Sequence, residues 1–205
     1  MRALAVVMTF VATLLTASGA NADVARGLIM FERGEFSRAV AELLPDARGG
    51  DPRAQYVVGV ILLNDLAEPS APNEDAAYWI TKAAEQNYVQ AQTELARMYR
   101  AGDHVEQDFA KMVHWYERAA EEGDVGAQLF VADAYAYGQG VEIDLVAAYM
   151  WYDIALEYWG PLAVRARDLV AEQMTPEQIA EAERRANRWL AERERKAQAQ
   201  EEKQN

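Results

Sequence analysis

The chain has no cysteine among its 205 residues, which excludes disulfides, thiolate chemistry and an N-terminal lipid anchor on cysteine. Basic residues are also scarce, with 20 Lys and Arg against 33 Asp and Glu, for a net charge of −13 at pH 7. Such acidity argues against nucleic acid or an anionic membrane as the binding partner.

Residues that commonly carry catalysis are few. The two histidines, His104 and His114, lack a His-Glu-x-x-His spacing, and His114 directly precedes a tryptophan, where we expect it to pack. After residue 22 the serines are Ser37 and Ser70, and neither lies in a Gly-x-Ser-x-Gly elbow. Gly138-Gln139-Gly140 does not follow a strand, so it does not predict a phosphate loop. We therefore expect no catalytic residue, no metal and no cofactor.

Long apolar runs are missing as well. No apolar stretch after Asp23 is long enough to cross a membrane. At the N-terminus, Arg2 precedes an apolar run over residues 3–15, which is shorter than the roughly 20 residues a span requires. The run is followed by Ala20-Asn21-Ala22, a pattern that signal peptidase accepts. We expect a signal peptide cleaved after Ala22 and a periplasmic or secreted protein; the alternative is a buried first helix.

What the sequence does contain is an internal repeat. Trp79, Trp115 and Trp151 are spaced by 36 residues. Alanines upstream keep nearly the same register, at Ala54, Ala91, Ala127 and Ala163. Several residue types that hold one register over three or four copies indicate a repeat architecture, in which each unit needs its neighbours to bury its apolar faces.

Each copy has the pattern of two helices. In the copy over residues 88–121, the third when copies are counted from residue 23, Ala91, Leu95 and Tyr99 share one face at helical spacing. Asp108 stands where a second helix would be capped. The second helix places Trp115 on its apolar side. We expect five all-α helix pairs, at about 23–48, 51–86, 88–121, 124–157 and 160–196.

These pairs predict the division of the chain. A signal peptide over 1–22 precedes a first helical pair over 23–50 and three repeats over 51–159, while a C-terminal pair over 160–196 precedes a disordered polar tail over 197–205. We expect the three repeats to cover about 51–87, 88–123 and 124–159.

The repeat resembles the Sel1-like repeat, a relative of the tetratricopeptide repeat. The resemblance rests on Ala-x3-Leu-Ala/Gly-x2-Tyr, Gly-x-Gly-Val-x2-Asp and Trp-Tyr-x2-Ala-Ala-x2-Gly-Asp-x2-Ala-Gln patterns. The fourth copy is near ideal, with Tyr135, Val141 and Trp151 in place. The third copy has Asp103-His104 where the fourth has Gln139-Gly140, so we expect its turn to differ.

The resemblance implies a right-handed superhelical solenoid of antiparallel helix pairs that adapts one protein to another. Exported bacterial relatives include inhibitors of sensor kinases and parts of polysaccharide-export machinery. A cysteine-rich branch is associated with penicillin binding and β-lactam hydrolysis, but this chain lacks those cysteines. A cell-wall- or β-lactam-acting hydrolase and a structural part of a polysaccharide-export machine therefore remain the alternatives to a non-enzymatic adaptor.

If the repeats coil as in these relatives, the first helix of each pair lines the concave face. Arginines and tyrosines on that face could hold a protein or peptide partner, although ordinary surface charge is the alternative for any single residue. The candidate partner-binding residues are Tyr56, Arg97, Arg100, Asp133, Tyr137 and Arg165. We expect a monomer that binds a protein or peptide in the bacterial envelope.

Overall fold

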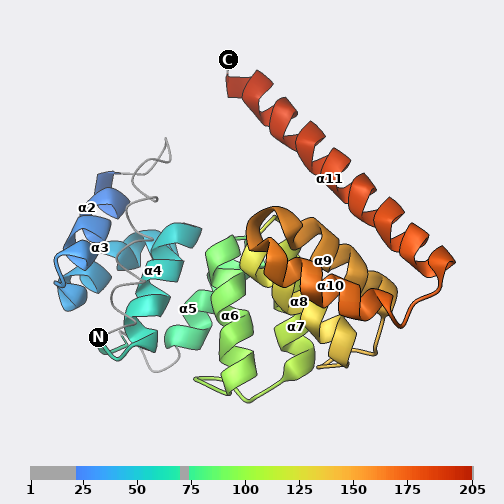
Figure 1. Cartoon of the computed structure of the whole chain (residues 1–205). Coiled ribbons are helices and arrows are strands. Elements are labelled where there is room, and N and C mark those ends of the chain that lie inside the picture. Colours follow the sequence, from blue (N-terminus) through green and yellow to red (C-terminus); the bar gives the residue numbers. More distant parts are fainter. Residues whose placement is uncertain (1–21, 70–73, 205) are drawn as a thin grey trace. The chain divides into compact units, whose positions relative to one another are not determined.

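The computed structural model describes residues 22–69 and 74–204, and these ranges contain ten helices and no strand (Figure 1). The helices are α2 (Ala22–Glu32), α3 (Phe36–Arg48), α4 (Pro52–Leu63), α5 (Ala76–Glu85), α6 (Val89–Ala101), α7 (Phe109–Glu121), α8 (Val125–Tyr137), α9 (Leu145–Trp159), α10 (Pro161–Ala171) and α11 (Pro176–Gln204). The predicted signal peptide lies outside the described residues, apart from Ala22, with which α2 begins.

Aspartates fix where many of the helices begin. The Asp51 carboxylate accepts hydrogen bonds from the backbone N–H groups of Arg53 and Ala54, at 2.9 and 3.1 Å. These contacts satisfy donors that have no partner within the helix. The same cap starts four further helices, at Asp75, Asp108, Asp124 and Asp144. The sequence therefore determines these helix starts locally.

Helices α2 to α6 form one compact unit, in which each helix packs against the next along the chain. The interior of this unit contains Leu28, Leu43, Ile61 and Trp79, each at most 2% exposed. The small buried side chains of Ala83 and Ala84 on α5 allow the neighbouring helices to approach closely.

Helices α7 to α11 form the second unit. Here α8 packs against α7 and α9, while α10 and α11 both pack against α9. Tyr116, Val131 and Tyr152 are at most 1% exposed in its interior. Trp151 on α9 meets Trp189 on α11 edge to face, with ring centroids 5.8 Å apart.

A buried glutamine recurs in the first helix of three successive pairs. Its side-chain amide donates a hydrogen bond to an alanine carbonyl oxygen at the end of the preceding helix. The pairs are Gln55 with Ala47 at 2.9 Å, Gln92 with Ala84 at 3.3 Å, and Gln128 with Ala120 at 3.4 Å. The repeat therefore includes a polar link that joins each pair to the one before it.

The turns after α6 and α8 share one backbone conformation, so the expectation that they differ is wrong. Gly102 and Gly138 both adopt the left-handed conformation, with φ of 73° and 70°. Two residues further on, His104 and Gly140 also have positive φ, at 57° and 82°. Histidine is among the non-glycine residues found more often in this region, and His104 follows the path of the glycine at some cost in strain.

The last pair departs from the repeat at its first turn. A residue with positive φ follows the second helix of earlier pairs, namely Gly50 at 99°, Asn87 at 62° and Gly123 at 90°. Trp159 occupies this position after the fourth copy, where it remains inside a longer α9, and Gly160 takes the positive φ of 45°. A bulky side chain strongly disfavours that backbone region, so the turn moves by one residue.

At the C-terminus the structure differs from the sequence expectation of a disordered tail over 197–205. Helix α11 continues to Gln204. Its last two turns are composed largely of Ala, Gln, Glu and Lys, which are strong helix formers. Intrinsic propensity rather than packing explains this part of the helix, because residues 191–202 are exposed.

Candidate partner-binding surfaces

In the first unit, Tyr56 on α4 and Tyr88 before α6 form an aromatic pair with ring centroids 5.3 Å apart. Burial raises the pKa of Tyr88 to about 12 and raises the pKa of Tyr56 well above its usual value. Negative charge on Glu94 raises the pKa of Tyr56 further, whereas Arg97 lowers it. The structure thus brings two sequence-predicted residues, Tyr56 and Arg97, into electrostatic range of each other.

Arg97 forms an ion pair with Glu94 on the same helix. The Arg97 guanidinium lies 3.2 Å from the Glu94 carboxylate, and the two side chains are 56% and 18% exposed. Burial raises the pKa of Glu94, although the Arg97 charge partly opposes this effect. Sequence reasoning missed Glu94, even though its spacing of three residues from Arg97 on a helix could have indicated the pair.

Three more polar side chains lie on or directly before α6, namely those of Tyr88, Thr93 and Arg100. Arg100 is exposed in the last turn of α6, where its backbone carbonyl oxygen accepts a hydrogen bond from Gln107 at 2.8 Å. The Tyr88 and Thr93 hydroxyl oxygens are shielded from solvent and have no hydrogen-bond partner among the described residues. Since shielded hydroxyls usually find a partner, each of these two groups leaves hydrogen-bonding capacity unsatisfied in the free protein.

In the second unit, Asp133 on α8 accepts a hydrogen bond from the Tyr152 hydroxyl on α9. Burial and this bond raise the pKa of Tyr152 well above its ordinary value. The bond occupies the carboxylate of Asp133 in joining α8 to α9. Tyr137, one turn further along α8, is 73% exposed.

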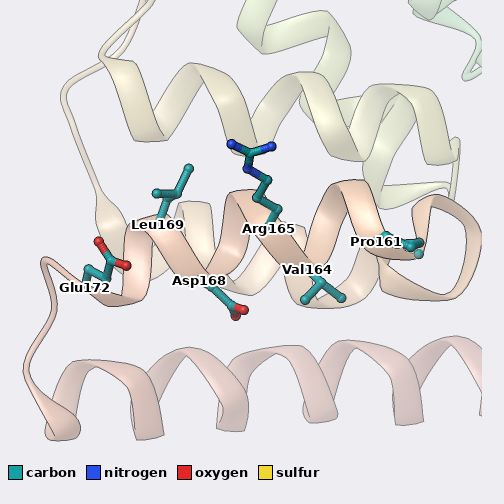
Figure 2. Close-up of a pocket in the computed structure, with 7 residues that line it drawn as sticks. Pro161, Val164, Arg165, Asp168, Leu169 and Glu172 are labelled. Atoms are coloured by element: carbon teal, nitrogen blue, oxygen red, sulfur yellow. The ribbon is translucent and has the colours of Figure 1, made fainter.

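Arg165 lies on α10 and is exposed (Figure 2). Its side chain forms no hydrogen bond or ion pair with any residue in 22–69 or 74–204. Its neighbour Arg167 is engaged instead, 2.8 Å from Asp153 and with its guanidinium 5.6 Å from the centre of the Tyr149 ring. Of the six predicted residues, Arg97, Arg100, Tyr137 and Arg165 thus face solvent, while Tyr56 and Asp133 are partly buried.

The described residues contain no group of three or more His, Cys, Asp and Glu side chains that could hold a metal ion. His114 packs its ring against Trp115, with centroids 5.2 Å apart. No helix in the described part of the chain is long and apolar enough to cross a membrane.

Comparisons with known proteins agree with this architecture. The model of the Sel1 repeat matches residues 52–88, 89–124 and 125–157. A search of curated proteins found no match. Among solved structures, a protective antigen of uropathogenic Escherichia coli strains that displays an SLR fold is 28% identical, with a TM-score of 0.63 over 82% of this chain and 36% of the antigen.

A Sel1 repeat protein from Oxalobacter formigenes is 25% identical, with a TM-score of 0.63 over 71% of this chain and 60% of that protein. The chain thus spans less than two thirds of the length of either relative. The prediction of an all-α repeat fold of the Sel1 type is confirmed. Because the three matched repeats cover more than half of its residues, the chain belongs to the Sel1 repeat family, whose members generally act as protein-interaction scaffolds and are typically not enzymes.

Proposed function

We propose that this protein is an exported, non-catalytic adaptor that binds a protein or peptide partner in the bacterial envelope. Its binding surface in the first unit is the α4–α6 face, which comprises Tyr56, Tyr88, Thr93, Arg97 and Arg100. The general role of Sel1 repeats in protein interaction supports the class of function. The export step rests on the N-terminal sequence pattern.

The observation that carries the proposal is the tyrosine at position 88. The equivalent residues of the neighbouring copies, Asp51 and Asp124, cap their helices with side-chain hydrogen bonds. Tyr88 makes no such bond, so α6 lacks a cap that typically contributes about 1 kcal/mol. Its ring instead packs on Tyr56 and its hydroxyl has no partner, an arrangement that favours binding over local stability.

The chemistry of this face suits an extended peptide or loop with acidic residues. The tyrosine rings can cover an apolar side chain. A local side-chain movement on binding that exposes the hydroxyls of Tyr88 and Thr93 would let them exchange hydrogen bonds with backbone groups of the partner. Arg97, which is more than half exposed, and Arg100 can each take a carboxylate. The ion pair with Glu94 already restricts the Arg97 side chain in the free protein, so less rotamer freedom is lost on binding.

Affinity capture from a soluble envelope extract of the source organism, with residues 23–205 as bait, tests the proposal. The double variant Arg97→Glu/Arg100→Glu should lose the captured protein. The variant Arg188→Glu/Arg195→Glu makes the same charge change on exposed residues of α11 and should retain it. Equal recovery by both variants would refute the α4–α6 face as the binding surface.

A second variant separates binding from folding. Tyr88→Phe keeps the ring and removes a hydroxyl that has no partner in the free protein, so the free energy of unfolding should hold or rise slightly. Binding of the captured partner should weaken several-fold. If binding by Tyr88→Phe equals that of the native chain, the hydroxyl takes no part in recognition.

Export is tested separately by the intact mass of the protein purified from an envelope fraction. We expect the mature chain to begin at Asp23. A full-length chain that stays in the cytoplasm would refute export and leave the binding proposal intact.

A further inference from the structure

Helix α10 presents a solvent-exposed face that carries both apolar and charged side chains. This α10 face comprises Val164, Arg165, Asp168, Leu169 and Glu172. The buried residues of the helix are Ala163 and Val170, whereas Leu162, Val164 and Leu169 are 61%, 38% and 50% exposed. A surface hollow of about 680 Å³ follows this face. Figure 2 shows the side chains that line it, with Arg165 and Leu169 on one side of α10 and Val164 and Asp168 on the other.

Comparison with the preceding copy explains why this face is open. The core positions Gln128, Val131 and Ala132 on α8 recur 36 residues later as Val164, Arg167 and Asp168. Helix α8 packs directly on α9, the second helix of its pair, and these positions are buried. In the last pair the second helix, α11, packs against α9 and does not cover α10 in the way that α9 covers α8. Polar residues, Arg167 and Asp168, stand at two of the three positions. The apolar side chains that remain exposed on α10 are not required by packing within the chain.

The charged residues of this face are arranged in a self-complementary way. Arg165 and Glu172 are both exposed, and neither side chain forms an ion pair or hydrogen bond with the described residues. They lie seven residues apart, which is two helical turns and roughly 10 Å along the axis. Leu169 lies close to the midpoint between them on the same side of the helix.

We propose that the α10 face binds the α10 face of a second copy of this chain, antiparallel about a two-fold axis near Leu169. Arg165 then lies opposite Glu172 of the second copy, and Glu172 lies opposite Arg165 of the second copy. The two Leu169 side chains meet at the axis. A two-fold interface requires one patch to complement itself, and an opposite-charge pair flanking a central leucine does so.

The charge of the whole molecule also selects this face. Two copies with a net charge of −13 each repel one another over most of their surfaces. Arg167 forms ion pairs with both Asp153 and Asp168. Together with Arg165 and Glu172 these groups leave a net charge of only −1 around the α10 face. A single helix face is smaller than the roughly 800 Å² per partner of a standard interface, so the dimer is reversible and dissociates in the micromolar range or above.

Sedimentation equilibrium of residues 23–205 over a concentration series tests this proposal. Arg165→Glu and Glu172→Arg should each weaken association by about tenfold or more, since every substitution acts twice in a two-fold dimer. The double variant Arg165→Glu/Glu172→Arg restores both pairs and should recover native association within about threefold. The control Arg188→Glu on α11 should leave association unchanged.

The absence of cysteine permits an independent readout. Leu169→Cys should form a covalent dimer with a short bis-maleimide, whereas Leu190→Cys, on α11 and 37% exposed, should not. A chain that stays monomeric at millimolar concentration overturns the proposal. So does a double variant as weak as the single ones, or equal cross-linking of both cysteine variants. This dimer replaces the sequence expectation of a monomer, and it stands or falls independently of the α4–α6 face.

Discussion

The hydroxyl of Tyr152 on α9 donates a hydrogen bond to the carboxylate of Asp133 on α8, and thereby joins the two helices of the fourth copy. Tyr152→Phe removes the donor and leaves a partly buried carboxylate short of a partner. We expect a loss of about 2 kcal/mol in the free energy of unfolding, as measured by urea denaturation. Tyr137→Phe, at a tyrosine that is 73% exposed on α8, is the control and should change stability little. An unchanged midpoint for Tyr152→Phe would mean that water replaces the bond at no cost.

The three buried glutamines are not equivalent, although they occupy one repeat position. Gln55 donates to Ala47 and accepts from the Gln86 amide at 2.7 Å, so both of its polar groups are satisfied. The side-chain oxygen of Gln92 has no partner among the described residues. Gln55→Leu should therefore cost about 2 kcal/mol, and Gln92→Leu clearly less, because the second change also removes an unsatisfied atom.

Thermal and urea unfolding of the two leucine variants, made in the same background, would measure this difference. Equal losses would show that the donated bond alone determines the cost. A larger loss for Gln92→Leu would mean that its oxygen has a partner, such as an ordered water, in solution.

The paired turns allow a test in opposite directions. His104 holds φ at 57°, so His104→Gly should relieve strain and raise the free energy of unfolding by about 0.5–1 kcal/mol. Gly140→Ala should destabilise by about 2 kcal/mol or more. A Cβ at Gly140, where φ is 82°, would lie 2.2 Å from the carbonyl oxygen of Phe109. Differential scanning calorimetry measures both, and a destabilised His104→Gly would show that the imidazole makes a compensating contact.

The sequence predicts those parts of the fold that depend on neighbouring residues along the chain, above all the helix pairs. The Trp and Ala register and the aspartate caps gave the helix pairs, because core spacing and capping are local properties. The turn at His104 was mispredicted, because a sequence difference there does not change the backbone. The shift at Trp159 was missed, since it depends on which residue can take positive φ. Arg97 was chosen for its position, whereas its partner Glu94 and the unpartnered hydroxyl of Tyr88 depend on packing between α4 and α6, which periodicity does not show.

Burial of Glu94 gives the last prediction, a pH dependence. Burial raises the pKa of Glu94 above its ordinary value, so the folded state binds a proton more tightly there than the unfolded state. The stability that this provides is complete below the unfolded pKa and is lost as pH rises through the folded pKa. At pH 7 the native chain therefore carries the cost of a desolvated carboxylate, which Glu94→Gln removes.

The ion pair with Arg97 that Glu94→Gln also removes is worth little, because the arginine is 56% exposed. We therefore expect Glu94→Gln to melt at a higher temperature than the native chain at pH 7. The gap should shrink as the pH falls through the raised pKa of Glu94, because the protonated side chain is then neutral like that of glutamine. Thermal melts of the two proteins at matched pH isolate this residue from the other titrating acids. A variant that is less stable at pH 7 would contradict the prediction and show that the pair with Arg97 outweighs the cost of burial.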